Sequence, residues 1–217
     1  MMIQLNFNQL TIPPGSQLLV KEVDWLTFEH LLEQLGEKRA VKLSYSQGLL
    51  EIMTPLLEHE DDKNILSDLV KILLEELNIE FRAVGSTTFK NKRMAQAIEP
   101  DECFYIEHEQ AIRGKKRVDL TVDPPPDLAI EIDITTRTHL GNYEALEVPE
   151  LWRYDGQQLF IYILQQNVYI ESDHSLHFPQ LPLHEAIPYH LKYSKEFGRN
   201  ATMKLFRHWL HEKMRLS

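Results

Sequence analysis

The sequence predicts an α+β protein with a mixed β-sheet, and three observations carry this prediction. A stripe of apolar residues runs from 65 to 77 at the i, i+3 and i+4 spacing of one helix face. A strict alternation of apolar and polar positions runs from 127 to 134, with the period of two that a strand requires. Helix-like and strand-like segments follow one another as helix, strands, helix, strands, which favours the α+β class.

A helix and a hairpin are expected at the start of the chain. Residues 23–38 have helical spacing, and Gly36 is placed to end that helix. Residues 41–54 resemble two short strands joined by a turn at 46–48. The apolar stripe then predicts a long helix over residues 58–78.

Strands dominate the middle of the chain. Residues 79–89 are expected to form one strand, followed by a loop or short helical turn at 91–96. A second strand should enter from Pro100. The prolines at 124–126 mark the beginning of a third strand, since proline is excluded from the middle of a sheet.

The last third should contain a short helix, a strand, a hairpin and a helical tail. Residues 142–172 hold the first three of these elements. From about Glu185 onward the chain is expected to be helical in pieces, broken near Pro188 and Gly198.

Length and composition predict one globular domain spanning residues 1–217. Hydrophobic residues make up 43% of the chain and charged residues 26%. No apolar run approaches the ~20 residues of a membrane-spanning helix, and the start does not resemble a signal peptide. The single cysteine, Cys103, cannot form an internal disulfide, so a cytoplasmic setting is expected.

Charge is unevenly distributed along the chain. The net charge of −10 argues against a protein that coats nucleic acid without sequence preference. Segment 81–98 nevertheless has no acidic residue, and segment 192–217 has seven Lys or Arg against two Glu. The basic residues of the first segment are Arg82, Lys90, Lys92 and Arg93. Both segments allow local phosphate contacts, with a solvated face as the alternative.

Carboxylates occupy one face of the third predicted strand. Positions 128, 130, 132 and 134 are aliphatic, whereas Asp127, Glu131 and Asp133 share the opposite face with one alanine. This face is either simply solvated or a binding surface. Asp101, which follows Pro100 on the preceding strand, would join Glu131 and Asp133 if the two strands are neighbours.

Three clustered carboxylates need a compensating group. Two unit charges ~5 Å apart repel by roughly 3 kcal/mol at an effective dielectric constant of ~20. Protonation, a basic side chain or a cation relieves this repulsion. Oxygen-only ligands suit Mg²⁺ or Mn²⁺, which lower the pKa of bound water and neutralise charge on a phosphodiester.

The chain resembles the Uma2 family over about residues 20–170, because it contains three sequence segments similar to that family, in the same order. The segments are GSTTFKNKRMAQAIEPDECFYI, PPDLAIEIDIT and YEALEVPELWRYDG. This family, formerly a domain of unknown function and abundant in cyanobacteria, belongs to the PD-(D/E)XK nuclease superfamily. The resemblance implies a restriction-endonuclease-like fold, in which helices flank a central mixed sheet. It also implies that Asp101 and Glu131 hold Mg²⁺ or Mn²⁺.

The chain departs from the superfamily pattern at position 133. The pattern expects lysine there, to orient or deprotonate the attacking water, and this chain has Asp133. Three explanations stay open: Lys90 or Lys92 substitutes in space, a metal-bound water needs no lysine, or the protein is catalytically weak or inactive. Between 135 and 142 the only basic side chains are Arg137 and His139.

The helix before the strands supplies a further candidate ligand. Superfamily enzymes often have an acidic residue on this helix, and Glu58, Asp61 or Asp62 would match it. Acidic residues are also favoured at helix N-termini by the helix dipole, which is the alternative explanation.

The sequence therefore predicts a metal-dependent endonuclease that hydrolyses DNA phosphodiester bonds. Asp101, Glu131, Asp133, Lys90 and Lys92 are its candidate catalytic residues, and Asp101, Glu131 and Glu58 its candidate metal ligands. The alternative is a catalytically impaired protein of the same fold that binds nucleic acid or protein. A homodimer is expected by analogy with other nucleases of this fold.

Overall fold

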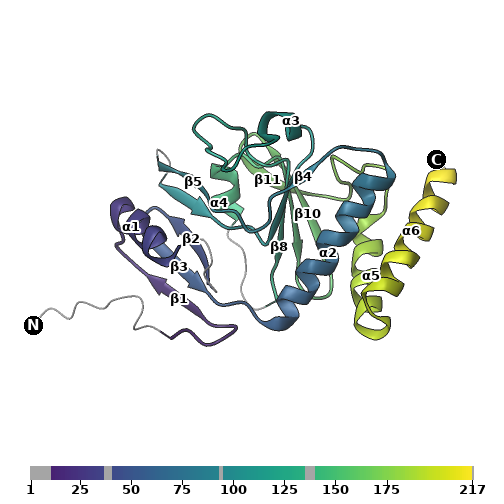
Figure 1. The fold of residues 1–217 in the computed structure, drawn as a ribbon, viewed down its shortest axis with the longest axis horizontal. Helices are drawn as coiled ribbons and strands as arrows, with labels where there is room; N and C mark the ends of the chain where they lie inside the picture. Colours follow the sequence, from purple (N-terminus) through teal and green to yellow (C-terminus); the bar gives the residue numbers. More distant parts are fainter. Residues whose placement is uncertain (1–10, 37–40, 93–94, 135–139, 217) are drawn as a thin grey trace, which may run out of the picture.

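The computed structural model describes residues 11–36, 41–92, 95–134 and 140–216, which form two β-sheets and six helices. The smaller sheet lies toward the N-terminus, and the larger one occupies the centre of the molecule (Figure 1). The α+β class with a mixed sheet flanked by helices is thereby confirmed. The second sheet is an addition that the sequence did not predict.

The smaller sheet is entirely antiparallel and has the strand order β1-β3-β2-β6-β5. Its strands are β1 (Gln17–Val20), β2 (Lys42–Ser46), β3 (Leu49–Met53), β5 (Phe89–Asn91) and β6 (Gln96–Ile98). Helix α1 (Trp25–Leu35) packs on it, and Phe28 stacks on Tyr45 with ring centroids 4.7 Å apart. Asp24 caps this helix by accepting a hydrogen bond from the Thr27 amide at 2.7 Å.

The larger sheet is mixed and has the strand order β11-β10-β9-β8-β7-β4. Only the pair β8–β9 is parallel, within the described residues. The strands are β4 (Arg82–Ala83), β7 (Glu102–Tyr105), β8 (Leu128–Ile132), β9 (Glu150–Tyr154), β10 (Leu159–Gln165) and β11 (Val168–Ser172).

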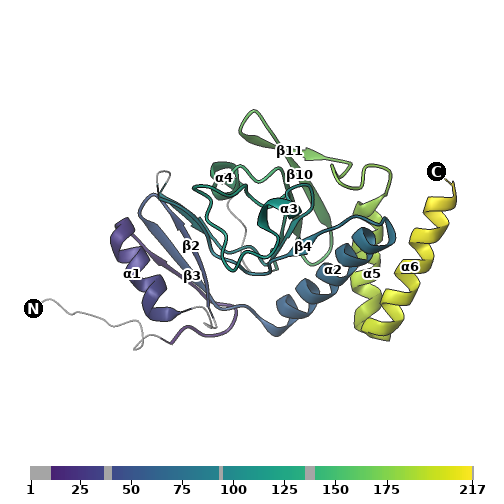
Figure 2. The same cartoon turned by 45° about the horizontal axis from the view of Figure 1, so that its top comes forward.

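Helices cover both faces of the larger sheet. The long helices α2 (Leu57–Glu76) and α5 (Leu183–Phe197) pack against one face, and α6 (Arg199–Leu216) packs on α2 and α5, as Figures 1 and 2 show. The short helices α3 (Glu109–Ile112) and α4 (Leu140–Ala145) contribute buried residues to the opposite face.

Both faces of β8 are therefore buried. Its aliphatic positions join the core with the three long helices, whereas Ala129 packs on the opposite side with Tyr143 of α4. The acidic face predicted for this strand is not solvated, because only 6% of Glu131 is exposed and only 1% of Asp127. The carboxylates need partners inside the protein.

Two local predictions were wrong. Residues 79–89 do not form one strand, since they supply the two-residue strand β4 and the first residue of β5 in different sheets. Pro188 lies inside α5 and does not break it, because packing of Ala186, Ile187 and Leu191 holds the helix in place. The predicted break at Gly198 is confirmed, and its φ of 80° suits glycine.

No helix of the described residues is long and apolar enough to cross a membrane.

Helix α2 should contribute strongly to stability through its buried face. We expect Leu69→Ala to lower the free energy of unfolding by about 2–5 kcal/mol, because Leu69 is fully buried and the substitution leaves a cavity. Leu57→Ala is the matched control on the same helix, since Leu57 is 79% exposed. Its cost should stay within about 0.5 kcal/mol in urea denaturation. Equal losses in the two variants would contradict this packing.

Candidate active site

Asp101 and Glu131 lie side by side on neighbouring strands. Strand β7 pairs with β8 so that Glu102 is opposite Ile130, and the Asp101 amide donates to the Ile130 carbonyl at 3.1 Å. The Asp101 carboxylate accepts a second hydrogen bond from the Ile132 amide at 2.8 Å. These two backbone contacts fix Asp101 beside Glu131, so the condition that the two strands are neighbours, which the sequence left open, is met.

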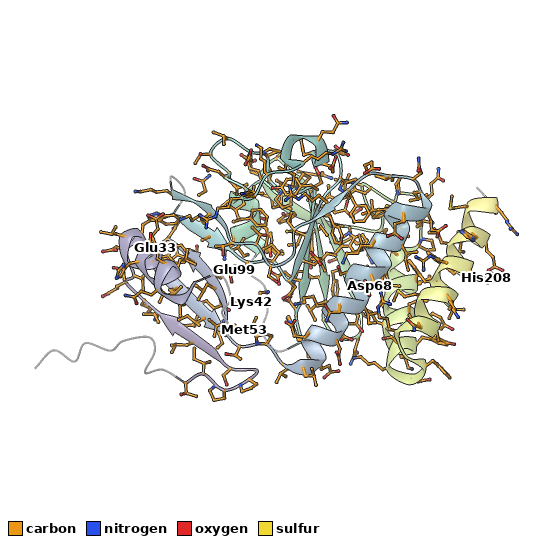
Figure 3. The ribbon with its side chains drawn as sticks, in the orientation of Figure 1. Glu33, Lys42, Met53, Asp68, Glu99 and His208 are labelled. Atoms are coloured by element: carbon orange, nitrogen blue, oxygen red, sulfur yellow. The ribbon has the colours of Figure 1, made fainter. Side chains whose placement is uncertain are left out.

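Lys42 joins the two carboxylates. Its ammonium lies 2.6 Å from Oδ1 of Asp101 and 3.1 Å from Oε2 of Glu131. Lys42 begins β2 of the smaller sheet, and Figure 3 shows it between the two sheets. Its side chain is 15% exposed, whereas both carboxylates are buried. The compensating cation that the acidic cluster requires is thus part of the chain itself.

The charges of these three groups depend on one another. Burial raises the pKa of the Asp101 carboxyl, but Lys42 and His59 outweigh that effect and hold the pKa below its usual range. Burial also raises the pKa of the Glu131 carboxyl, and repulsion from Asp101 helps to keep it well above its usual value despite Lys42. Burial alone would lower the pKa of Lys42, yet Asp101 and Glu131 raise it. Lys42 therefore stays protonated and cannot serve as a general base.

His59 and Tyr143 complete the surroundings of the carboxylates. Nε2 of His59, on α2, lies 3.1 Å from Oδ2 of Asp101, although the contact lacks the alignment of a good hydrogen bond. The Tyr143 hydroxyl, on α4, donates to Oε1 of Glu131. Both side chains are buried, so they restrict the orientation of the two carboxylates.

Glu99 positions Lys42 from the same segment that carries Asp101. Its carboxylate accepts a hydrogen bond from the backbone amide of Leu43 at 3.0 Å. Glu99 is itself buried, with 4% of its surface exposed, and also accepts from the Thr88 hydroxyl. Because Leu43 follows Lys42 directly, this contact holds the beginning of β2 against the segment 99–101, as the labels of Lys42 and Glu99 in Figure 3 show.

Asp133 binds a different partner. Its Oδ2 accepts a hydrogen bond from Nε of Arg153 at 2.6 Å, and both side chains are buried. The Arg153 guanidinium also lies over the Tyr162 ring, 5.7 Å from the ring centroid. The acid found where the superfamily pattern has lysine is therefore neutralised by an arginine on β9.

The remaining predicted site residues lie apart from the pair of Asp101 and Glu131. Glu58 is largely exposed and binds the Lys195 ammonium at 3.0 Å, and the same ammonium binds buried Asp62 at 3.1 Å. Asp61 is exposed. Lys90 pairs with Glu29 at 2.9 Å, and Lys92 is exposed in the turn after β5. Arg137 and His139 fall outside the described residues.

A divalent metal ion fits the two carboxylates but has few other protein ligands. No group of three or more His, Cys, Asp or Glu side chains in the described part of the chain is arranged to hold a metal. Mg²⁺ is commonly bound by only one or two carboxylates, with water and substrate phosphate as its other ligands. Since one oxygen of Asp101 and one of Glu131 already converge on a single cation, their chemistry and direction suit such an ion.

Lys42, His59, Tyr143 and Glu99 were not among the predicted site residues. His59 is adjacent to the candidate Glu58, and Tyr143 is the first residue of one of the three family-like segments. Neither position indicated contact with a carboxylate. Lys42 belongs to a strand in which polar and apolar residues alternate, which looks like an ordinary half-solvated strand. Only the packing of the two sheets reveals its role.

One comparison with known proteins identifies a family. A family model described as "Uma2: Putative restriction endonuclease" matches residues 25–195, a range that contains all of the cluster. Among solved structures, the chain is similar to a nuclease from Anabaena variabilis, itself described as putative. The two share 18% sequence identity and a TM-score of 0.43 over 61% of this chain and 76% of that chain. Comparison with the curated proteins found no match.

Removing Lys42 should destabilise the protein, because it leaves buried carboxylates without their cation. We expect Lys42→Met to lower the free energy of unfolding by about 3–5 kcal/mol at pH 7. Lys90→Met is the matched control, since the exposed pair with Glu29 is worth only about 0–1 kcal/mol. Urea denaturation of both variants measures the difference, and equal losses would contradict the role of Lys42.

The deficit of Lys42→Met should also depend on pH. Lys42 lowers the pKa of both carboxyls, so its removal raises these pKa values in the folded protein. A carboxyl with a raised folded pKa stabilises the fold below its unfolded pKa and loses that contribution as the pH rises. The deficit should therefore be smaller at about pH 4–5 than at pH 7 in paired urea titrations. A deficit that grows toward acidic pH would contradict this prediction.

Proposed function

Because the chain belongs to the Uma2 family, described as "Putative restriction endonuclease", we propose that it is a metal-dependent endonuclease that hydrolyses DNA phosphodiester bonds. The observation that carries the proposal is the convergence of Asp101 and Glu131 on one cationic centre, Lys42. Buried acidic groups held this way are typical of a functional site, since a purely structural core avoids them.

Asp101 and Glu131 are the proposed ligands of Mg²⁺ or Mn²⁺. When bound, such an ion neutralises charge on the phosphate and lowers the pKa of a water molecule. The amide of Ile132 and the hydroxyl of Tyr143 hold the two carboxylates by their other oxygens. This leaves Oδ1 of Asp101 and Oε2 of Glu131 directed toward the Lys42 ammonium, where a metal ion would approach them.

Lys42 takes the part that the superfamily pattern gives to a lysine at position 133. Its ammonium carries three N–H donors and a positive charge that the carboxylates preserve. In this proposal the ammonium donates to the scissile phosphate or to the attacking water, which positions that group and offsets the developing negative charge. It does not remove a proton, because it stays protonated.

Nuclease assays on substituted proteins test the assignment. Asp101→Asn and Glu131→Gln should each reduce plasmid cleavage in Mg²⁺ or Mn²⁺ to background, because they remove the anionic ligands while keeping the side-chain shape. Lys42→Arg, which keeps the charge but changes the donor geometry, should lower the rate on the order of 10²-fold. Thermal melts establish that each variant is folded. Equal cleavage by the wild type and all three variants would refute this site.

The variant Glu58→Gln tests whether the metal site has only the carboxylates of Asp101 and Glu131 as protein ligands or also has Glu58 of α2. Glu58 is exposed and paired with Lys195, so we expect cleavage to be unchanged in this variant. A loss comparable to that of Asp101→Asn would instead make Glu58 a ligand.

Two observations favour a second function, a non-catalytic nucleic-acid-binding or protein-interaction module. Lys42 already compensates the carboxylates, and Asp133 replaces the expected lysine. Calorimetry with Mn²⁺ distinguishes the two functions. Heat of binding in the wild type that disappears in Asp101→Asn supports the nuclease, and no heat in either protein supports the module. A cytoplasmic setting and a homodimer remain parts of the main proposal.

A further inference from the structure

A basic groove lies beside the segment that carries Asp101. It has a volume of about 540 Å³ and runs between residues 82–90 and residues 115–118. Its lining includes five cationic side chains, and none of the described residues that line it is acidic. The five are Arg82, Lys90, Lys115, Lys116 and Arg117. Such a concentration of positive charge is unexpected in a protein whose net charge is −10, and it indicates an anionic ligand.

Arg82 connects the two walls of the groove. Its guanidinium donates to the backbone carbonyl of Ile112 and, at 2.7 Å, to that of Lys115. These contacts hold the loop after α3 against β4, which Figure 2 shows close to α3. Because backbone carbonyls carry no net charge, they satisfy the donors of Arg82 without neutralising it.

The lysines of the groove have exposed side chains. The Lys90 ammonium pairs with Glu29 at 2.9 Å, and the Lys115 ammonium pairs with Asp123. The pair with Glu29 is solvent-exposed and weak, so a phosphate can replace Glu29 at little cost. Asp123 is buried and holds Lys115 at the groove. Lys116 and Arg117 are exposed at the groove as well.

Hydroxyl groups tie the groove to the candidate active site. The Ser86 hydroxyl donates to the backbone carbonyl of Asp101 at 3.3 Å, and the Thr88 hydroxyl donates to Glu99. Both residues line the groove. A ligand in the groove therefore lies against the same short segment, 99–101, that supports Asp101 and Lys42.

The lining also limits the form of the ligand. No aromatic side chain of the described residues lines the groove, whereas proteins that bind single strands stack bases on aromatic rings. Arginine and lysine without stacking partners suit the phosphates of a duplex, whose bases remain paired. We propose that this groove binds the phosphate backbone of double-stranded DNA next to the candidate active site. The proposal rests on the proposed nuclease function and adds to it the surface that holds the substrate.

Binding assays without cleavage test the groove. The background is Asp101→Asn in buffer with EDTA, and the probe is a fluorescent 20-base-pair duplex followed by anisotropy. The charge-reversed variant is Lys116→Glu with Arg117→Glu. The matched control is Lys192→Glu with Lys204→Glu, an equal change of charge on exposed residues of α5 and α6, which lie apart from α3 and β4 (Figure 1).

We expect the groove variant to bind the duplex at least about tenfold more weakly than the control, with a shallower dependence of affinity on salt. Circular dichroism and thermal melting establish that both proteins are folded. Equal affinities of folded groove and control variants would overturn the proposal. Groove-dependent binding of the corresponding single strand, without binding of the duplex, would overturn it as well.

Different experimental results would contradict the proposed groove and the proposed nuclease function. If the wild-type protein does not cleave DNA but the groove variant alone loses duplex binding, the groove stands and the nuclease function falls. If the wild-type protein cleaves DNA and the groove variant binds the duplex like the control, and if the same charge reversals made without Asp101→Asn leave cleavage at the level of their control, the nuclease function stands and the groove falls.

Discussion

The ion contacts of Lys42 with Asp101 and Glu131 are the constraint on which the rest of the site depends. Without a cation, two ionised carboxylates at ~5 Å would repel by roughly 3 kcal/mol, and burial would add to that cost. The larger sheet supplies both acids, and the smaller sheet supplies the cation. The site therefore exists only when the two sheets pack correctly. Glu99, two residues before Asp101, reinforces this dependence, because its carboxylate accepts a hydrogen bond from the backbone of β2.

This arrangement separates two roles that one strand fills in the superfamily pattern. There, the acidic ligand and the lysine both belong to the (D/E)XK strand. Here β8 provides Glu131, Arg153 neutralises Asp133 directly after this strand, and the lysine beside the carboxylates comes from β2. The proposed chemistry would need a positively charged N–H donor beside the carboxylates, and the strand that supplies this donor would not change its electrostatic effect. A lysine on another sheet does, however, make the site sensitive to any movement between the sheets.

Local patterns together with the family resemblance indicated Asp101 and Glu131 as candidate site residues, whereas their contact with Lys42 depended on tertiary packing. The order Pro100, Asp101 and the alternation around Glu131 placed two acids on strands that proved to be neighbours. Lys42 is 59 residues from Asp101 and 89 from Glu131 along the chain, and its strand shows only an ordinary alternation. The second sheet was missed for a similar reason, because strands as short as β5 and β6 carry too few residues for a periodic signal. Helix α2, with twenty residues and a long apolar stripe, could be predicted from its own sequence.

The distribution of charge makes the proposed binding of a polyanion compatible with an acidic protein. In about 0.15 M salt a charge is screened beyond ~8 Å, so a phosphate in the groove interacts with the nearby cations far more than with the net charge of −10. If the groove binds DNA as proposed, the acidic surface elsewhere would act against binding in other orientations and favour the one that brings DNA to the groove. Because Ser86 and Thr88 of the groove contact segment 99–101, that orientation would also place the DNA backbone beside Asp101. In the proposed function, substrate binding and chemistry would then depend on the same few residues between β6 and β7.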